Sequence, residues 1–346
     1  MKNEIDIAFA LLKSALDGTT PEIGPLDSSQ WWSLFRLLQQ NHVAALTADA
    51  MSRLEVPREV KIPWLAECEK AERWHRYQRE VQTEIIDVMR QHGIETMVLK
   101  GTHLAQYYPR PEQREFGDLD LYFYDKHDEA DALAHKILKV TVSNEAHHHS
   151  KYNYRGVTVE SHYDFLNTHF PPSNRRYEKM LKELANTRQV LPTTHYPLPT
   201  FEILFLLRHM AGHFAASRIT LRDLVDWTLT CKALEDKADW TLVEKTIEDY
   251  GMTDFVAALN AIVKNRLETS SHSHPAATQS LVEHDIVYGS VDDHAGDGSS
   301  RLFWKLRRWR ALAWKRKMVY NDSPLLLWLA ALGSHATKPH SILHKQ

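Results

Sequence analysis

The chain has 346 residues, which is enough for two or three structural units and a sizeable core. It carries 42 basic and 45 acidic residues, a formal net charge of −3, so the overall charge gives no argument for nucleic-acid binding. Its two cysteines, Cys68 and Cys231, are far apart and belong to no metal-binding pattern, as expected for thiols in a reducing compartment.

The sequence shows no secretory signal and no membrane-spanning segment. The first residues carry acidic groups, and the longest apolar run, Pro324 to Gly333, is about half of the roughly 20 residues that a membrane span requires. We therefore expect a cytoplasmic protein.

Residues 1–93 are predicted to form an N-terminal helical region. Apolar residues at three- and four-residue spacing predict a short helix over Ile5 to Leu16, a second helix from Asp27 or Ser28 up to Pro57, and a third, long helix from Pro63 that ends at Gly93. The many aromatic residues of these helices are interpreted as packing groups.

Residues 94–192 alternate between strand and helix patterns and form the predicted core. A short strand ending at Leu99 leads into Lys100-Gly101-Thr102. A glycine at a strand-to-helix junction lets backbone N–H groups approach a phosphate closely, and Lys100 and the Thr102 hydroxyl are placed to help.

Two aspartates, Asp118 and Asp120, follow in the next predicted strand. Because side chains alternate along a strand, both aspartates point to one side while Leu119 and Leu121 point into the core. Two adjacent carboxylates repel each other unless a cation lies between them, and hard oxygen ligands suit Mg²⁺ or Mn²⁺. The pair therefore predicts a divalent metal site.

A later strand, Val157 to His162, supplies a third carboxylate. Its alternating pattern puts Thr158, Glu160 and His162 on one face. A helix over His127 to Val140 and a strand over Lys151 to Arg155 are predicted before it. Between them, His147-His148-His149 is interpreted as an exposed turn, with a role in holding the triphosphate or the acceptor as the alternative.

These residues resemble a known family. The sequence L-K-G-T-x-L-x-x-Y-Y-P, then R-x-x-x-D-L-D-L and later V-E-S-H-Y, is similar to the bacterial uncharacterised nucleotidyltransferase family of the DNA polymerase β-like superfamily. A weaker likeness is to the toxin nucleotidyltransferases of abortive-infection systems, which have two glycines where this chain has only Gly101. The motifs span Glu95 to Phe165, and 15 residues, His103 to Gly117, separate Thr102 from Asp118.

The resemblance implies an enzyme that moves an NMP from an NTP, ATP being the first expectation, to an acceptor. The acceptor stays open between a sugar phosphate, another small molecule, a tRNA end and a peptide or protein. Asp118 and Asp120 would hold two Mg²⁺ ions, or Mn²⁺, and Glu160 would complete the metal site and assist deprotonation of the acceptor. Lys100, Gly101 and Thr102 would take the β- and γ-phosphates.

Two further residues of the motifs have open roles. His162 would either orient Glu160 or contact substrate, and Arg114 would either pair with phosphate or support the Asp loop; a structural role is the alternative for both. A phosphotransferase on the same fold, and a non-catalytic nucleotide-binding or interaction protein, are the competing functions.

The rest of the chain is predicted to be helical around one loop. Residues 193–268 form a helical region that the resemblance places along the cleft, with His209, His213 and Arg222 as candidates for lining it. Residues 269–300, rich in Ser, His, Asp and Gly, are predicted to be a flexible loop. Residues 301–346 form basic, Trp-rich helices. The basic stretch 301–320 either contacts an anionic surface or packs through its tryptophans. The expected fold class is α+β, a small mixed sheet with helical regions on both sides.

Overall fold

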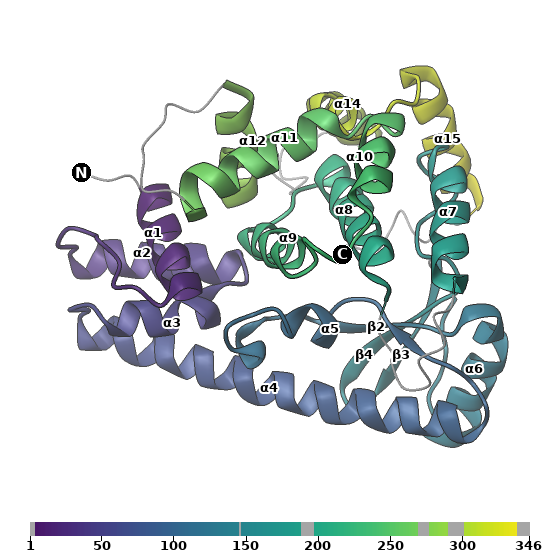
Figure 1. Ribbon diagram of the computed structural model, residues 1–346, viewed down its shortest axis with the longest axis horizontal. Helices are drawn as coiled ribbons and strands as arrows, with labels where there is room; N and C mark the ends of the chain where they lie inside the picture. The colour runs from purple at the N-terminus through teal and green to yellow at the C-terminus, as the bar shows by residue number, and fades with distance from the viewer. Residues whose placement is uncertain (1–3, 145–146, 188–196, 269–276, 290–300, 338–346) are drawn as a thin grey trace.

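The computed structural model describes residues 4–144, 147–187, 197–268, 277–289 and 301–337. It is an α+β fold in which a four-stranded mixed sheet lies among many helices, as Figure 1 shows. This confirms the predicted fold class.

The N-terminal region begins with four helices. They are α1 (Glu4–Asp17), α2 (Ser28–Gln40), α3 (Ala44–Ser52) and α4 (Arg58–Gln91). A capping box starts α2, in which the Asp27 side chain accepts the Gln30 backbone N–H and the Gln30 side chain accepts the Asp27 N–H. The single helix predicted up to Pro57 is wrong, because the chain turns at His42, whose φ is +56°. The buried Asn41 amide fixes this turn by donating to the carbonyls of Leu37 and Val287.

The long helix α4 starts at Arg58, earlier than the predicted Pro63, which lies inside the helix. Its first half packs against α3, and the Trp64 indole donates to the Ala44 carbonyl at 2.8 Å. Its second half runs below the sheet at the bottom of Figure 1. There Val81, Ile85 and Met89 share one hydrophobic core with Leu119 and Leu121 of the sheet.

The sheet has the order β1-β2-β4-β3. Its strands are β1 (Met97–Val98), β2 (Asp118–Tyr122), β3 (His149–Tyr154) and β4 (Val157–His162), and short helices lie between them: α5 (Thr102–Ala105), η1 (Pro111–Gln113), η2 (Tyr124–Lys126), α6 (His127–Leu133) and the π-helical turn η3 (Ala134–Leu138). The central pair, β2 and β4, is parallel, whereas β1 with β2 and β3 with β4 are antiparallel. A parallel pair needs a crossover, which α6 and β3 provide here.

Helices α7 to α11 lie on the opposite side of the sheet from α4 (Figure 1). They are α7 (Asn174–Asn186), α8 (Pro199–Ala216), α9 (Leu221–Ala233), α10 (Trp240–Asp249) and α11 (Thr253–Ile262), which continues as the π-helical turn η4 (Val263–Glu268). In one large core, Met97, Tyr122 and Phe165 from the sheet side meet Phe201 and Phe205 of α8. The sheet face that carries the aspartates therefore lies under α8.

The flexible loop predicted over 269–300 is wrong in its middle part. Residues 277–288 form α12 (Ala277–Tyr288), which packs against α11 because Val282, Ile286 and Val287 are buried in the large core. The outer parts of that prediction, 269–276 and 290–300, lie outside the described residues.

The basic C-terminal stretch forms two helices, α13 (Arg301–Ala311) and α14 (Ala313–Val319), and α15 (Pro324–Thr337) follows. Several of its cations have partners inside the protein. Lys315 is completely buried and pairs with Asp285 of α12, and the Arg316 guanidinium stacks on the Trp309 ring at 3.7 Å. These contacts support the packing alternative for this stretch. The remainder of the predicted region, 338–346, lies outside the described residues.

Candidate functional site

The three predicted carboxylates come from two neighbouring strands. In the parallel register of β2 and β4, Asp118 is opposite Thr158 and Asp120 is opposite Glu160. Directly opposite residues point to the same face of a sheet, so this register brings the three acids together. Asp120 is buried, with 3% of its surface exposed, while Asp118 and Glu160 are partly accessible.

A lysine lies among these carboxylates. Lys100 Nζ is 3.0 Å from Asp120 Oδ1 and 3.2 Å from His209 Nε2 of α8. Burial opposes the charge of Lys100, but the carboxylates of Asp120, Asp118 and Glu160 outweigh it and raise its pKa. In return, although burial alone would raise the pKa of Asp120, Lys100 and His162 hold it well below its usual range. In this state of the protein Lys100 is therefore an ion-pair partner of Asp120.

The loop between β1 and α5 turns at Gly101. Its φ is +53°, and a Cβ built on it would lie 3.3 Å from the Phe116 ring, so only glycine fits without strain. The next residue, Thr102, donates its hydroxyl to Gln82 Oε1 of α4 at 2.6 Å. The loop that the sequence assigns to phosphates is thus fixed to the long helix on one side.

His162 at the end of β4 reaches both acids. Its Nε2 is 3.1 Å from Asp120 Oδ1 and 3.9 Å from Glu160 Oε2, and its Nδ1 is 3.2 Å from the Asp164 carbonyl. Burial and the charges of Asp120 and Asp118 raise the pKa of Glu160. His162 therefore bonds to Asp120, and its expected role of orienting Glu160 stays a prediction.

Arg114 is placed to support the loop. Its buried guanidinium makes two hydrogen bonds of 2.7 Å to the Asp226 carboxylate of α9 and a third, 3.1 Å long, to the Gly101 carbonyl. The Tyr108 hydroxyl donates to the same Asp226 at 2.8 Å. Because its donors are used inside the protein, Arg114 fits the supporting role better than the phosphate-binding one.

The candidate cleft residues come from α8 and α9. His209 contacts Lys100, and burial together with that cation lowers the pKa of His209 well below its usual range. His213 lies one turn further along α8, with its ring 4.4 Å from the His209 ring. Arg222 pairs with Asp223 at 3.0 Å and reaches the Glu115 carbonyl. Of these three residues, His209 is the one that contacts Lys100, which is paired with Asp120.

The three consecutive histidines do not form the exposed turn that the sequence predicted. His149 is the first residue of β3 and is opposite His162, and His147 and His149 are both buried. Burial and His162 lower the pKa of His149 to about 3, so its imidazole is neutral. The prediction failed because it started this strand at Lys151; extending the polar alternation back by two residues would have put His149 on the face of Glu160 and His162.

The acid cluster fits a divalent cation. Asp120, Glu160 and His162 each offer a ligand atom, and these atoms lie within 4.8 Å of one another. Two carboxylates with Asp118 beside them form a hard oxygen set that suits Mg²⁺ or Mn²⁺. Asp120 and Glu160, with His162, are therefore the residues grouped closely enough to hold an ion, and Asp118 stays a predicted ligand beside them.

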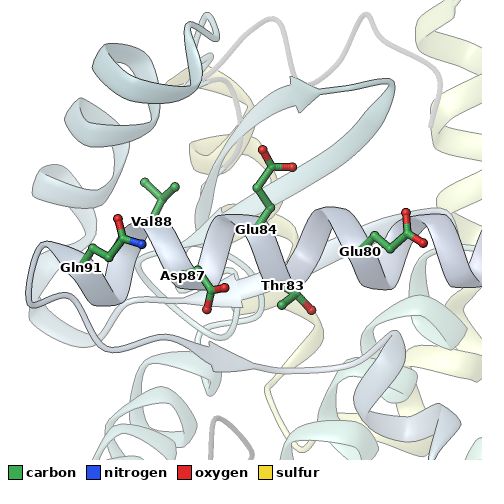
Figure 2. A pocket seen from close by; sticks show the side chains of 6 residues that line it. All are labelled: Glu80, Thr83, Glu84, Asp87, Val88 and Gln91. Atoms are coloured by element: carbon green, nitrogen blue, oxygen red, sulfur yellow. The ribbon is translucent and has the colours of Figure 1, made fainter.

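A shallow surface hollow lies elsewhere, on α4. It is lined by Glu80, Thr83, Glu84, Asp87, Val88 and Gln91. Figure 2 shows that these side chains all come from one helix. Glu84 is already bound there by the Tyr154 hydroxyl and by Arg155, at 2.7 Å each. None of the acids of β2 and β4 lines this hollow, so we do not assign it to the candidate site.

Comparison with known proteins assigns the chain to a family. A family model described as "Uncharacterised nucleotidyltransferase" matches residues 27–268, and the chain belongs to this family. The matched range holds the glycine loop, all three acids and the helices α8 and α9. Membership indicates a transferase with nucleotidyl transfer as its general activity and a nucleotide as a substrate.

Two other comparisons gave no relative. No curated protein and no solved structure matches the chain significantly. Within the described residues, no helix is both long enough and apolar enough to cross a membrane.

Proposed function

We propose that this protein transfers a nucleoside monophosphate from an NTP, ATP first, to a hydroxyl or phosphate acceptor, with Mg²⁺ or Mn²⁺ held by Asp118, Asp120 and Glu160. The register that puts Asp120 opposite Glu160, beside the loop at Gly101, is the observation that carries this proposal. When bound, the divalent ions neutralise the triphosphate and stabilise the entering and leaving oxygens of an in-line displacement.

In the proposed reaction the acceptor oxygen forms a bond to the α-phosphorus. The bond between that phosphorus and the bridging oxygen of the β-phosphate breaks, and pyrophosphate leaves. Glu160 takes the proton of an acceptor hydroxyl. His162 holds Asp120 in place through its Nε2, which is 3.1 Å from Asp120 Oδ1.

The β- and γ-phosphates would bind at the loop that follows β1. Gly101 lets the chain turn there at a positive φ, and Lys100 supplies a cation next to it. Once divalent ions neutralise Asp120, we expect Lys100 to exchange that carboxylate for a phosphate oxygen. The helix α5 has only four residues, so Lys100 and the loop amides, rather than a helix dipole, would carry this interaction.

One observation favours a rival function. The Lys100 ammonium already neutralises Asp120, as expected if the protein binds nucleotide without turning it over. Transfer of the γ-phosphate on the same fold is a further rival. Product analysis separates all three.

The first experiment is calorimetric titration of the wild type with each of the four NTPs, with and without Mg²⁺. The variant is Asp118→Asn, because Asp118 is partly exposed and lies beside the metal site without the ion pair of Asp120. The matched control is Asp87→Asn. Asp87 is an acidic residue in the α4 hollow, on the other side of the sheet from the three acids. Mg²⁺-dependent binding that Asp118→Asn abolishes and Asp87→Asn retains supports the proposal. Binding that survives Asp118→Asn unchanged, or no binding of any NTP, contradicts it.

The second experiment determines which phosphate of ATP is transferred. ATP labelled at the α- or the γ-phosphate is incubated with the protein and with separate small-molecule, RNA and protein fractions of a cell extract. Nucleotidyl transfer moves the α-label to an acceptor and releases pyrophosphate, whereas phosphotransfer moves the γ-label. Nucleotide binding with neither transfer indicates the non-catalytic rival.

A further inference from the structure

Three histidines form a second cluster next to the acids. His148 precedes β3, His149 begins β3 and His162 ends β4. One ring nitrogen from each lies within 4.8 Å of those of the other two. The antiparallel pairing of β3 with β4 produces this arrangement, because it sets His149 directly opposite His162, and the carbonyl of His148 accepts the N–H groups of Tyr163 and Asp164.

Two nitrogens of this cluster lack a hydrogen-bond partner among the described residues. They are Nδ1 of His148 and Nδ1 of His149, and only 6% of the His149 surface is exposed. A buried polar atom without a partner costs about 1–3 kcal/mol, and folded proteins keep few of them. A ligand that accepts a nitrogen lone pair removes this cost, and a metal ion is such a ligand.

The contacts of His162 point the same way. Both of its ring nitrogens face oxygen acceptors: Nδ1 faces the Asp164 carbonyl at 3.2 Å and Nε2 faces the Asp120 carboxylate at 3.1 Å. A neutral imidazole carries one N–H and can donate to only one of them. An ion bound at Nε2 would leave the N–H on Nδ1 for the Asp164 carbonyl, which is the arrangement of a metal-binding histidine.

We propose that His148, His149 and His162 bind a transition-metal ion, Zn²⁺ first, at a site that adjoins the oxygen-ligand site of Asp118, Asp120 and Glu160 and has His162 in common with the acid cluster. Imidazole nitrogens suit Zn²⁺, Co²⁺, Ni²⁺ and Fe²⁺, whereas Mg²⁺ selects oxygen. Three histidines leave a fourth position open in a tetrahedral site. The nearest carboxylate on that side is Glu160, whose Oε1 is 3.5 Å from His149 Nε2.

The charges around the cluster balance in favour of a cation. Lys151 pairs with Glu160 at 3.3 Å, but half of its side chain is exposed, so it can move away. Glu160 and Asp120, the latter paired with Lys100, both lie within 4 Å of His162 and attract the ion. The proposal concerns metal binding alone and does not require the transfer reaction proposed above.

Cobalt(II) reports directly on these ligands. Co²⁺ in a site of three nitrogens with four or five ligands absorbs visible light strongly, whereas Co²⁺ in a six-coordinate oxygen site absorbs weakly. The full chain, stripped of metal with a chelator, is titrated with Co²⁺ alone while its visible spectrum is recorded. We expect one equivalent to give the strong bands, and an excess of Zn²⁺ to remove them.

Variants separate the two sites. His148→Ala removes a half-buried ligand and should weaken Co²⁺ binding at least about tenfold, with loss of the strong bands. His92→Ala, at the exposed end of α4, is the matched control and should leave both unchanged. Asp118→Asn should also leave the bands unchanged while abolishing Mg²⁺-dependent NTP binding, so the two proposals can fail independently.

Circular dichroism of the metal-free variants checks that each is folded, and His148→Gln, which keeps the volume, replaces His148→Ala if the latter is not. Absence of the strong bands in the wild type overturns the proposal. So does a spectrum that both His148 variants leave unchanged, or one that Asp118→Asn abolishes, because the ion would then lie among the carboxylates.

Discussion

Lys100 and Asp120 form an ion pair in the interior, with Nζ 3.0 Å from Oδ1 and with only 2% of the Asp120 side chain exposed. The pair joins the loop after β1 to the middle of β2. It connects the predicted phosphate loop to the predicted metal ligand, so a substitution at either residue should change the electrostatic environment of the other.

The first prediction concerns stability. Asp120→Asn leaves the Lys100 cation without its partner, and breaking a buried pair in this way costs about 3 kcal/mol. Asp118→Asn breaks no ion pair found in the described residues and removes a like-charge neighbour, so its effect should stay within about 0.5 kcal/mol. Denaturant unfolding in chelator-treated buffer measures both free energies. Equal losses in the two variants would contradict the pairing.

The second prediction concerns Lys100 as a competitor of the metal. In Lys100→Met we expect Mg²⁺ affinity without nucleotide to rise about tenfold, because a unit charge near 4 Å is worth up to about 4 kcal/mol at an effective dielectric of about 20. ATP affinity in the presence of Mg²⁺ should fall in the same variant. Calorimetry measures both, with the exposed Lys136→Met as control. If both affinities move in the same direction, the proposed exchange of partners is wrong.

The third prediction tests the turn at Gly101. Gly101→Ala places a Cβ at φ +53° and 3.3 Å from the Phe116 ring, and we expect it to lose about 1–3 kcal/mol of stability. Mg²⁺-dependent ATP binding should weaken with it. Gly117→Ala is the matched control, since its Cβ meets no atom within 4 Å and its φ is not positive. Thermal unfolding of both variants gives the comparison, and an equally mild effect at the two glycines would show that the turn is not strained.

The fourth prediction is a pH dependence. Burial against the Phe116 ring lowers the pKa of His75, more than the nearby Arg114 carbonyl raises it. The unfolded state therefore takes up the proton first as the pH falls below about 6.5, and the free energy of unfolding falls by up to about 1.4 kcal/mol per pH unit from this group.

His75→Gln removes that contribution, so the variant should lose less stability than the wild type between pH 8 and pH 5. Denaturant unfolding at the two pH values measures the difference. The control is His92→Gln, an exposed histidine at the end of α4, which should follow the wild type. A His75 variant that also follows the wild type would show that this histidine titrates normally when folded.

The strand pattern around the acids was predictable from the sequence. Period-two alternation alone places Asp118 with Asp120, and Glu160 with His162, on common faces. The pairing of β2 with β4 brings these two sets of residues together. The local sequence of neither strand indicates this pairing. It depends on which strands become neighbours, and the family resemblance supplied only the expectation that Glu160 joins the two aspartates at one metal site.

Other features depend on residues far apart in the sequence. The break after α2 is held by Asn41 bonding to Val287, and Arg114 finds its partner in Asp226. The helix α12 forms within a polar segment because α11 offers its apolar side chains a surface. Local composition predicts a loop there, and tertiary packing overrides it. The position of His149 in the site was missed for a local reason, because the strand was predicted to start at Lys151 and not at His149.

The shared core of α4 and the sheet sets a limit on how this protein can be divided. Val81, Ile85 and Met89 seal the underside of the sheet, and the same helix is anchored to α3 by Trp64. A gene fragment that starts at residue 94 would leave that apolar face open to water, however complete its motifs. The shortest fragment of the chain that can fold with its acids in place must therefore include α4. It must also include the helices against which α4 packs.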